Sequence, residues 1–243
     1  MAFYLIGLGL DKDTISKNAF EILKNCDKIY LESYTIEFPY KLEELKNCLD
    51  VNFRIIEREE LEETSFLKEA KEKNIALLIY GDPLSATTHS ELLLFCKKNK
   101  IPFKVFHNSS IFNVVSETGL FIYKFGKTCS IPKWTKGFKP VSFADYIKEN
   151  LSVKAHTLIL VDIGLIFQDA LKQLEIACEE KKIELKKLIV IQKAGTSSQK
   201  ILFGDFDSFK KMINIEAPFS FIIPSELNFK EEEFLKSYGE EIL

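Results

Sequence analysis

Over the first half of the chain, short continuous runs of hydrophobic residues alternate with segments in which hydrophobic residues recur every three or four positions. Continuous runs are typical of strands buried on both faces, whereas the wider spacing is typical of amphipathic helices. The pattern predicts strands at 3–8, 28–32, 52–56, 75–80 and 103–106, and helices at 14–26, 42–49, 65–73, 90–99 and 111–117. Regular alternation of strands and helices indicates an α/β domain with a largely parallel sheet covered on both faces.

This alternation stops between 124 and 140, where glycine and proline residues interrupt any long element. We therefore expect two domains, 1–126 and 127–243. In the second, the pattern predicts helices at 142–151 and 167–181 and strands at 157–161, 188–191 and 219–223, so this domain is also expected to be α/β. Acidic runs at 231–233 and 240–241 predict a C-terminal helix with a solvent-exposed face.

Composition narrows the class of protein. The 243 residues are 46% hydrophobic and 28% charged, with a formal net charge of -3. This balance argues against nucleic acid as the main partner, because phosphate binding normally requires a basic surplus. The apolar start lacks basic residues and ends at Asp11, and no later run approaches the roughly 20 residues of a membrane-spanning helix. Five cysteines without a Cys-x-x-Cys pair, and only three histidines, predict neither disulfides nor a metal site, so a cytoplasmic location is expected.

Three loops are candidates for chemistry, because ligands of parallel α/β sheets gather beyond the carboxyl ends of the strands. The first contains Gly7 and Gly9, which would let the backbone approach a ligand closely. It lacks the third glycine of a dinucleotide-binding fingerprint, since Lys12 occupies that position. The second loop, 81–89, begins Gly-Asp-Pro, and the third, 107–111, follows the strand at 103–106.

These loops also have a purely structural interpretation. Asp82 would close an Asx-turn, while Thr88 and Glu91 would form the capping box of the next helix. Ser109 or Ser110 would be a helix N-cap, and His107 would be a hydrogen-bonded structural residue. Judged on local pattern alone, the first loop fits either interpretation, and the structural interpretation is favoured for the other two.

Taken together, in this order and spacing, the loops resemble those of the diphthine synthase family, a branch of the tetrapyrrole methylase superfamily. The similarity is carried by the segments 4–10, 81–89, 107–111, 123–126 and 156–163. Most specific to this branch is the Gly-Asp-Pro segment that continues into Ala-Thr-Thr-His at 86–89. The segment 32–35, Glu-Ser-Tyr-Thr, also resembles the family.

This resemblance implies a homodimeric methyltransferase with two α/β domains of the tetrapyrrole methylase type and with S-adenosylmethionine bound in a cleft between them. The implied substrate is translation elongation factor two, methylated on the amino group of the 3-amino-3-carboxypropyl chain of a modified histidine, a step in diphthamide biosynthesis. The implied cofactor contacts are Leu10, Asp82, Ser85, Ser110 and Ile111 in the first domain, and Val161, Gln192 and Phe219, with Ala194 nearby, in the second.

Methyl transfer from a sulfonium ion depends on positioning and on a neutral attacking amine, and it needs no protein nucleophile. His107 and Tyr123 are the candidates for a general base, and water is the alternative. Two other functions stay open: a methylase of small tetrapyrrole or corrin precursors, and a non-enzymatic cofactor-binding module. The sequence leaves undecided how many methyl groups are transferred and whether a carboxylate is methylated.

Overall fold

The computed structural model describes residues 1–238, so the acidic run at 240–241 lies outside the described residues. The chain forms two compact units, one from Met1 to Asn113 and one that begins at Val114. This division falls earlier than the boundary at 126/127 expected from the sequence. The reason is that residues 120–126 pair with the second unit: Gly126 N–H donates to the His156 carbonyl at 2.9 Å, and His156 N–H donates to the Lys124 carbonyl at 2.9 Å.

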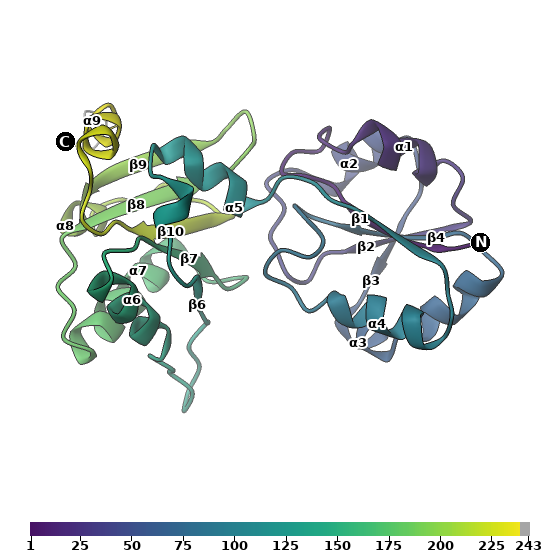
Figure 1. Cartoon of the computed structure of the whole chain (residues 1–243), viewed down its shortest axis with the longest axis horizontal. Helices are drawn as coiled ribbons and strands as arrows, with labels where there is room; N and C mark the ends of the chain where they lie inside the picture. Colours follow the sequence, from purple (N-terminus) through teal and green to yellow (C-terminus); the bar gives the residue numbers. More distant parts are fainter. Residues whose placement is uncertain (239–243) are drawn as a thin grey trace. The chain divides into compact units, whose positions relative to one another are not determined.

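The first unit is a five-stranded parallel sheet with helices on both faces, as the alternation of strands and helices predicts. In sheet order its strands are β3 (Arg54–Ile56), β2 (Lys28–Glu32), β4 (Ile75–Ile79), β1 (Phe3–Gly7) and β5 (Phe103–Phe106). Figure 1 shows α1 (Lys17–Leu23) and α2 (Leu42–Leu49) on one face, and α3 (Arg58–Glu63) and α4 (Ser90–Lys98) on the other.

Strands β1, β2, β4 and β5 each contribute to two hydrophobic cores, because successive strand residues point to opposite faces. Phe3 and Leu5 pack with residues of α4 and of the 3-10 helix Ser65–Lys71, whereas Ile6 packs with residues of α1 and α2. The continuous apolar runs in the sequence are therefore the signature of a sheet buried on both sides.

Two helices of this unit differ from the prediction. Helix α1 starts only at Lys17, because the Ser16 side chain caps it by accepting from Ala19 N–H at 3.3 Å. The helix predicted at 65–73 is a 3-10 helix that follows α3.

The second unit contains a mixed sheet. In sheet order its strands are β6 (Cys129–Ile131), β7 (Thr157–Val161), β10 (Phe219–Ile223), β8 (Lys187–Gln192) and β9 (Lys200–Asp205). Only the β6–β7 pair is parallel. The sequence analysis missed β6, which is short and lies within the irregular stretch, and β9, which is an edge strand paired only with β8.

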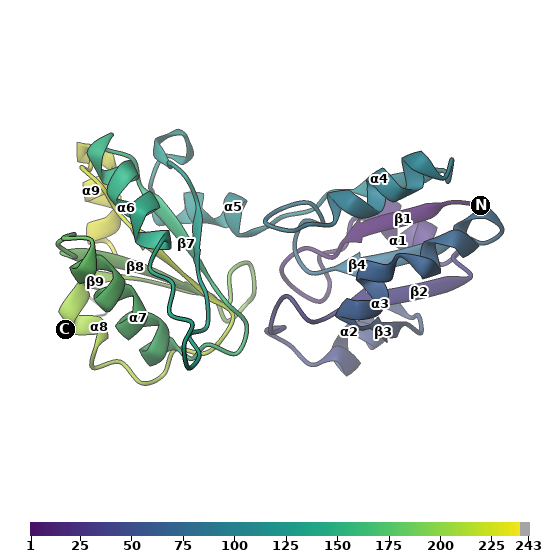
Figure 2. The same cartoon turned by 90° about the horizontal axis from the view of Figure 1, so that it is seen from below.

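Helices α6 (Phe143–Ser152) and α7 (Phe167–Glu180) cover one face of this sheet (Figures 1 and 2). Helix α7 contributes Phe167 to an aromatic cluster, in which its ring lies edge-on to Phe219 and Phe221 with centroids 5.6 and 5.7 Å away. The remaining helical elements are short: α5 (Ile111–Val114), the 3-10 helices Val115–Thr118 and Ile122–Lys124, α8 (Phe206–Phe209) and α9 (Phe229–Lys236).

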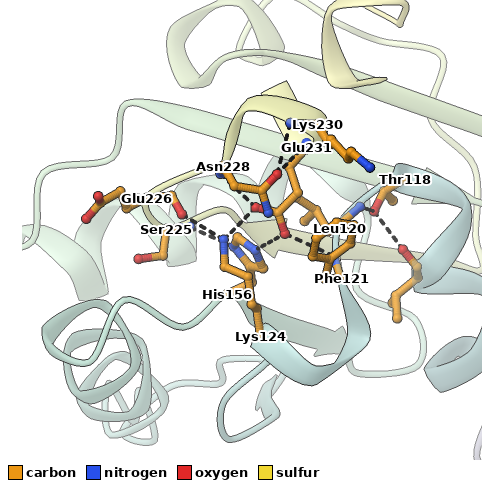
Figure 3. Close-up of polar contacts among 11 residues, drawn as sticks. Thr118, Leu120, Phe121, Lys124, His156, Ser225, Glu226, Asn228, Lys230 and Glu231 are labelled. Atoms are coloured by element: carbon orange, nitrogen blue, oxygen red, sulfur yellow. Dashed lines mark hydrogen bonds and ion pairs between the residues drawn. The ribbon is translucent and has the colours of Figure 1, made fainter. Parts of the chain in front are cut away.

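A buried carboxylate connects α9 to the rest of the second unit (Figure 3). Glu231 is 0% exposed, although it belongs to the acidic run predicted to face solvent, so that prediction is wrong at this position. It accepts from Asn228 N–H at 3.0 Å as half of a capping box, from Phe121 N–H at 3.0 Å and from the Lys124 ammonium. Burial of the carboxylate is tolerated because both of its oxygens accept hydrogen bonds.

The imidazole of His156 completes this cluster. Ser225 N–H donates to Nδ1 at 3.0 Å, so Nε2 carries the proton and donates to Glu231 at 3.2 Å. Burial lowers the pKa of His156, against the opposing effect of Glu231, so the ring is neutral near pH 7. The Glu231 side chain thus connects His156, just before β7, to residues 121–124 and to the start of α9.

We expect Glu231→Gln to lower the free energy of unfolding by about 2–4 kcal/mol, because it leaves the Lys124 charge without its anion. Urea unfolding measures the change. The control is Glu232→Gln, which removes a neighbouring exposed carboxylate paired with Lys236 and should cost less than about 1 kcal/mol.

Glu231→Gln should also change how the free energy of unfolding depends on pH in acid. Burial alone would raise the pKa of Glu231, but Lys124, the backbone donors and His156 lower it from 4.5 to about 2. A lowered folded-state pKa adds stability that is complete above the unfolded pKa and is lost as pH falls toward the folded one. Stability of Glu231→Gln should therefore fall less steeply between about pH 4.5 and pH 2 than that of the wild type. Parallel acid limbs would contradict this account.

Candidate functional site

The three loops singled out in the sequence meet at one edge of the first sheet. Strands β4, β1 and β5 are parallel neighbours, so their carboxyl ends lie together. Gly9 N–H donates to the Gly81 carbonyl at 3.1 Å, and Gly81 N–H donates back to the Gly9 carbonyl at 2.8 Å. A Cβ at Gly7 would lie 2.6 Å from the Gly81 carbonyl oxygen. The glycines are therefore required for the first two loops to pack against each other.

The Asp82 carboxylate joins the second loop to the third. Its Oδ1 accepts from Leu84 N–H at 2.9 Å, which is the predicted Asx-turn, and from the Ser85 hydroxyl at 3.2 Å. Its Oδ2 accepts from Asn108 N–H at 3.2 Å and from Nδ1 of His107 at 2.8 Å. The structural interpretation of Asp82 is thus confirmed, and the carboxylate also reaches across to the loop after β5.

Asp82 is held in its ionised form. Burial raises the pKa of this carboxyl, but the donors from Leu84, His107 and Asn108 outweigh that effect and lower the pKa below its ordinary value. A fixed negative charge therefore lies at the junction of the loops at neutral pH.

The capping box predicted from Thr88 and Glu91 is not formed. Helix α4 starts at Ser90, after an N-cap residue, His89, whose side chain makes no capping bond. Instead the Thr87 hydroxyl accepts from His89 N–H at 2.9 Å, and the His89 ring turns back toward Pro83.

The first-unit candidate residues gather around Gly81 and Asp82. A Cβ at Gly81 would lie 3.8 Å from Cδ2 of Leu10 and 3.9 Å from Cα of Ser110, while Ser85 bonds Asp82 directly. Leu10 and Ser110 are buried, and Ile111, next along the chain, is half-buried. The structure therefore brings the predicted residues of this unit to one place.

The second-unit candidates share one edge of the second sheet. Gln192 ends β8 and pairs in register with Phe219, which starts the antiparallel strand β10, and Val161 ends β7 on the other side of β10. The Phe219 side chain belongs to the aromatic cluster with Phe167 and Phe221. Its ring is therefore part of the hydrophobic core of the second unit.

Gln192 is the polar group of this edge. Its side chain is 4% exposed, and within the described part of the chain its Oε1 atom has no hydrogen-bond partner. A buried acceptor without a donor costs about 1–3 kcal/mol, which makes such an atom a candidate for bonding a ligand.

Two side chains to which the sequence analysis gave no role lie beneath the Gly-Asp-Pro loop. His89 and Glu32 are 3% and 1% exposed, and their nearest ring nitrogen and carboxylate oxygen are 4.0 Å apart. The signal available in the sequence was that both belong to segments with family resemblance. Of the two candidate bases, His107 is held by Asp82, whereas Tyr123 is 81% exposed on the 3-10 helix Ile122–Lys124.

Comparison with known proteins identifies the family of this chain. The model of the family described as Tetrapyrrole (Corrin/Porphyrin) Methylases matches residues 2–209. The chain belongs to this family. A Dictyostelium discoideum protein named diphthine methyl ester synthase is 32% identical over 98% of each chain. A crystal structure of diphthine synthase superposes with a TM-score of 0.89 at 28% identity, covering 98% of this chain and 96% of the other.

Other members of the family have a higher sequence identity to this chain, but over a shorter matched region. The diphthine methyl ester synthase of Schizosaccharomyces pombe is 42% identical over 66% of this chain. The matched region spans only 55–58% of the length of that protein and four further curated relatives.

Two negative findings apply to residues 1–238. No helix in that range is long and apolar enough to cross a membrane. The same residues contain no group of three or more His, Cys, Asp or Glu side chains placed to hold a metal ion.

We expect Asp82→Asn to lower the free energy of unfolding by about 1–3 kcal/mol, because the new amide group would face the donors of His107 and Asn108. Chemical denaturation measures the change. The control is Asp27→Asn, whose carboxylate accepts from Asn74 N–H on the same unit and should tolerate the substitution within about 1 kcal/mol. Equal small losses would mean that the charge at Asp82 does not hold the loops together.

Proposed function

We propose that this chain is an S-adenosylmethionine-dependent methyltransferase of the diphthine synthase type. Its substrate would be translation elongation factor two carrying a 3-amino-3-carboxypropyl histidine, and the amino group of that chain would be methylated in diphthamide biosynthesis. The observation that carries the proposal is the junction of three loops around the ionised Asp82. Family membership, and relatives of matching length named for this activity, support it.

The chemistry of these loops fits S-adenosylmethionine better than a phosphate-bearing cofactor. The ligand carries an amino group, ribose hydroxyls and an adenine, all of which donate hydrogen bonds to carbonyl and carboxylate oxygens. Residues 81–89 and 107–111 contain no Lys or Arg to neutralise a phosphate. Lys12, in the first loop, is paired with Glu44. We propose that Leu10, Asp82, Ser85, Ser110 and Ile111 hold the cofactor.

The unsatisfied acceptor of Gln192 is the corresponding feature of the second unit. A donor of the bound cofactor would relieve its burial cost. We propose that Gln192, with the backbone near Val161 and Phe219, contributes the remaining contacts.

In catalysis the cofactor supplies an electrophilic methyl group, and the protein orients the attacking amine and removes its proton. Of the two candidate bases, His107 is the better placed, because Asp82 accepts its Nδ1–H and leaves the lone pair on Nε2. The His107 side chain is 67% exposed and can pass the proton to water. Asp82 would thus serve both to hold the loops and to orient this imidazole.

The names of the relatives differ in the methylated atom that they imply. A methyl ester forms when a carboxylate oxygen attacks the methyl group, whereas the product proposed for this chain forms when the amine nitrogen attacks it. We propose the amine as the acceptor. We further propose that the protein is a cytoplasmic homodimer, as the resemblance implies, which light scattering after size-exclusion chromatography would test.

Mass spectrometry of elongation factor two provides the direct test. Incubation of the precursor-bearing factor with this protein and S-adenosylmethionine should add methyl groups that survive mild alkali, because an N-methyl group is stable where a methyl ester is hydrolysed. Loss of the added mass in alkali would move the acceptor to the carboxylate. Methylation of a tetrapyrrole precursor instead would establish the alternative substrate class, and binding without any transfer would establish the non-enzymatic module.

Two buried glutamines, Gln192 and Gln173, allow a test of whether Gln192 contacts the cofactor. Gln192→Met should weaken S-adenosylhomocysteine binding by roughly tenfold, since it removes one hydrogen bond to the ligand, while stability without ligand stays level or rises. Gln173→Met is the matched control, because Gln173 lies in α7 and also has a buried Oε1 without a partner among the described residues. Calorimetric titration should show wild-type affinity for the control. Equal affinities for both variants would remove Gln192 from the site.

A further inference from the structure

The Gly-Asp-Pro loop is supported from beneath by a buried histidine. Nδ1 of His89 lies 3.1 Å from the carbonyl oxygen of Pro83, the residue that follows Asp82. The carbonyl can only accept, so Nδ1 carries the proton and donates it. This bond fixes the peptide next to the charged carboxylate.

Glu32 lies at the opposite edge of the same ring. It ends β2, the strand beside β4, and its carboxylate is fixed by Tyr34 N–H at 2.7 Å, Thr35 N–H at 2.8 Å and the Thr35 hydroxyl at 2.6 Å. Oε2 then faces Nε2 of His89 across 4.0 Å. Because the turn after β2 immobilises the carboxylate, the imidazole is confined between Glu32 and Pro83.

We propose that His89 is a positioning residue of the cofactor loop, which acts by clamping the Pro83 carbonyl while Glu32 confines its ring. This inference rests on the proposed function, because it assigns the loop to the cofactor. Asp82 is then held from two sides: His107 and Asn108 bond its carboxylate, and His89 fixes the adjoining peptide. The loop also contains Ala86 at a φ of 55°, a left-handed conformation that a non-glycine residue keeps only when its surroundings enforce it.

Burial is consistent with this role. It lowers the pKa of His89, against the opposing influence of the Pro83 carbonyl and Glu32. The ring therefore acts as a neutral hydrogen-bond donor at physiological pH rather than as a charge.

The test compares substitutions that move or remove the donor. His89→Asn places an amide N–H near the position of Nδ1 and should bind S-adenosylhomocysteine within about threefold of the wild type. His89→Leu removes the donor, and His89→Gln moves it to the side that faces Glu32. Both should weaken binding by about tenfold or more in calorimetric titration.

A control variant distinguishes the loss of the hydrogen-bond donor from a general loss of stability. Cys96→Ala truncates a fully buried residue of α4, the helix that follows His89, and leaves the bond between His89 and Pro83 in place, so it should lower the thermal midpoint but keep wild-type affinity. If His89→Leu does not fold, the comparison of His89→Asn with His89→Gln serves the same purpose. Equal affinity of those two variants would overturn the inference.

Hydrogen exchange separates this inference from the proposed function. Amides of residues 84–88 should exchange faster in His89→Gln than in His89→Asn or Cys96→Ala, whether or not the protein binds S-adenosylhomocysteine. Unchanged exchange would overturn the clamp. A wild-type protein that fails to bind S-adenosylhomocysteine, with exchange as expected, would overturn the proposed function alone.

Discussion

The bond between Asp82 and the loop after β5 is the interaction on which the first unit's site depends. The two loops are 25 residues apart in sequence and meet only because β4, β1 and β5 run parallel in adjacent positions. A parallel sheet brings strand ends together but leaves the loops beyond them without a fixed relation. The carboxylate supplies that relation, because one of its oxygens serves its own turn and the other serves the neighbouring loop. The Asp82 side chain thus fixes the geometry of loops that the order of the strands brings together.

Much of this architecture could be predicted from the pattern of apolar residues. All five strands of the first sheet, and hence the edge where their loops meet, could be predicted, and the clearest signals were the continuous apolar runs of the buried strands β1 and β4. The first residue of each helix was harder to predict, because capping by a residue such as Ser16 depends on local backbone geometry. Strand β9 was missed for a different reason: it is an edge strand, and its pairing with β8 is formed only in the fold.

Residues whose environment is set by distant partners escaped prediction. Glu231 has the sequence context of an exposed helix face, yet it is buried because Phe121, Lys124 and His156 bring donors from other parts of the chain. His89 was noticed as part of a motif, but its contact with Pro83 depends on the path of the loop, and its contact with Glu32 on the adjacency of β2 and β4. A single sequence contains no direct record of such adjacency.

Satisfied and unsatisfied polar groups therefore carry different information in this protein. Glu231 and Asp82 each accept bonds on both oxygens, and such saturated groups fix the backbone around them. Gln192 is buried with an acceptor that no described residue satisfies, at a sheet edge where strands end. The described residues leave the burial cost of that atom uncompensated, and a donor from a bound ligand would offset it. Saturated groups hold the site in place, whereas an unsatisfied buried acceptor such as Oε1 of Gln192 has bonding capacity left for a ligand.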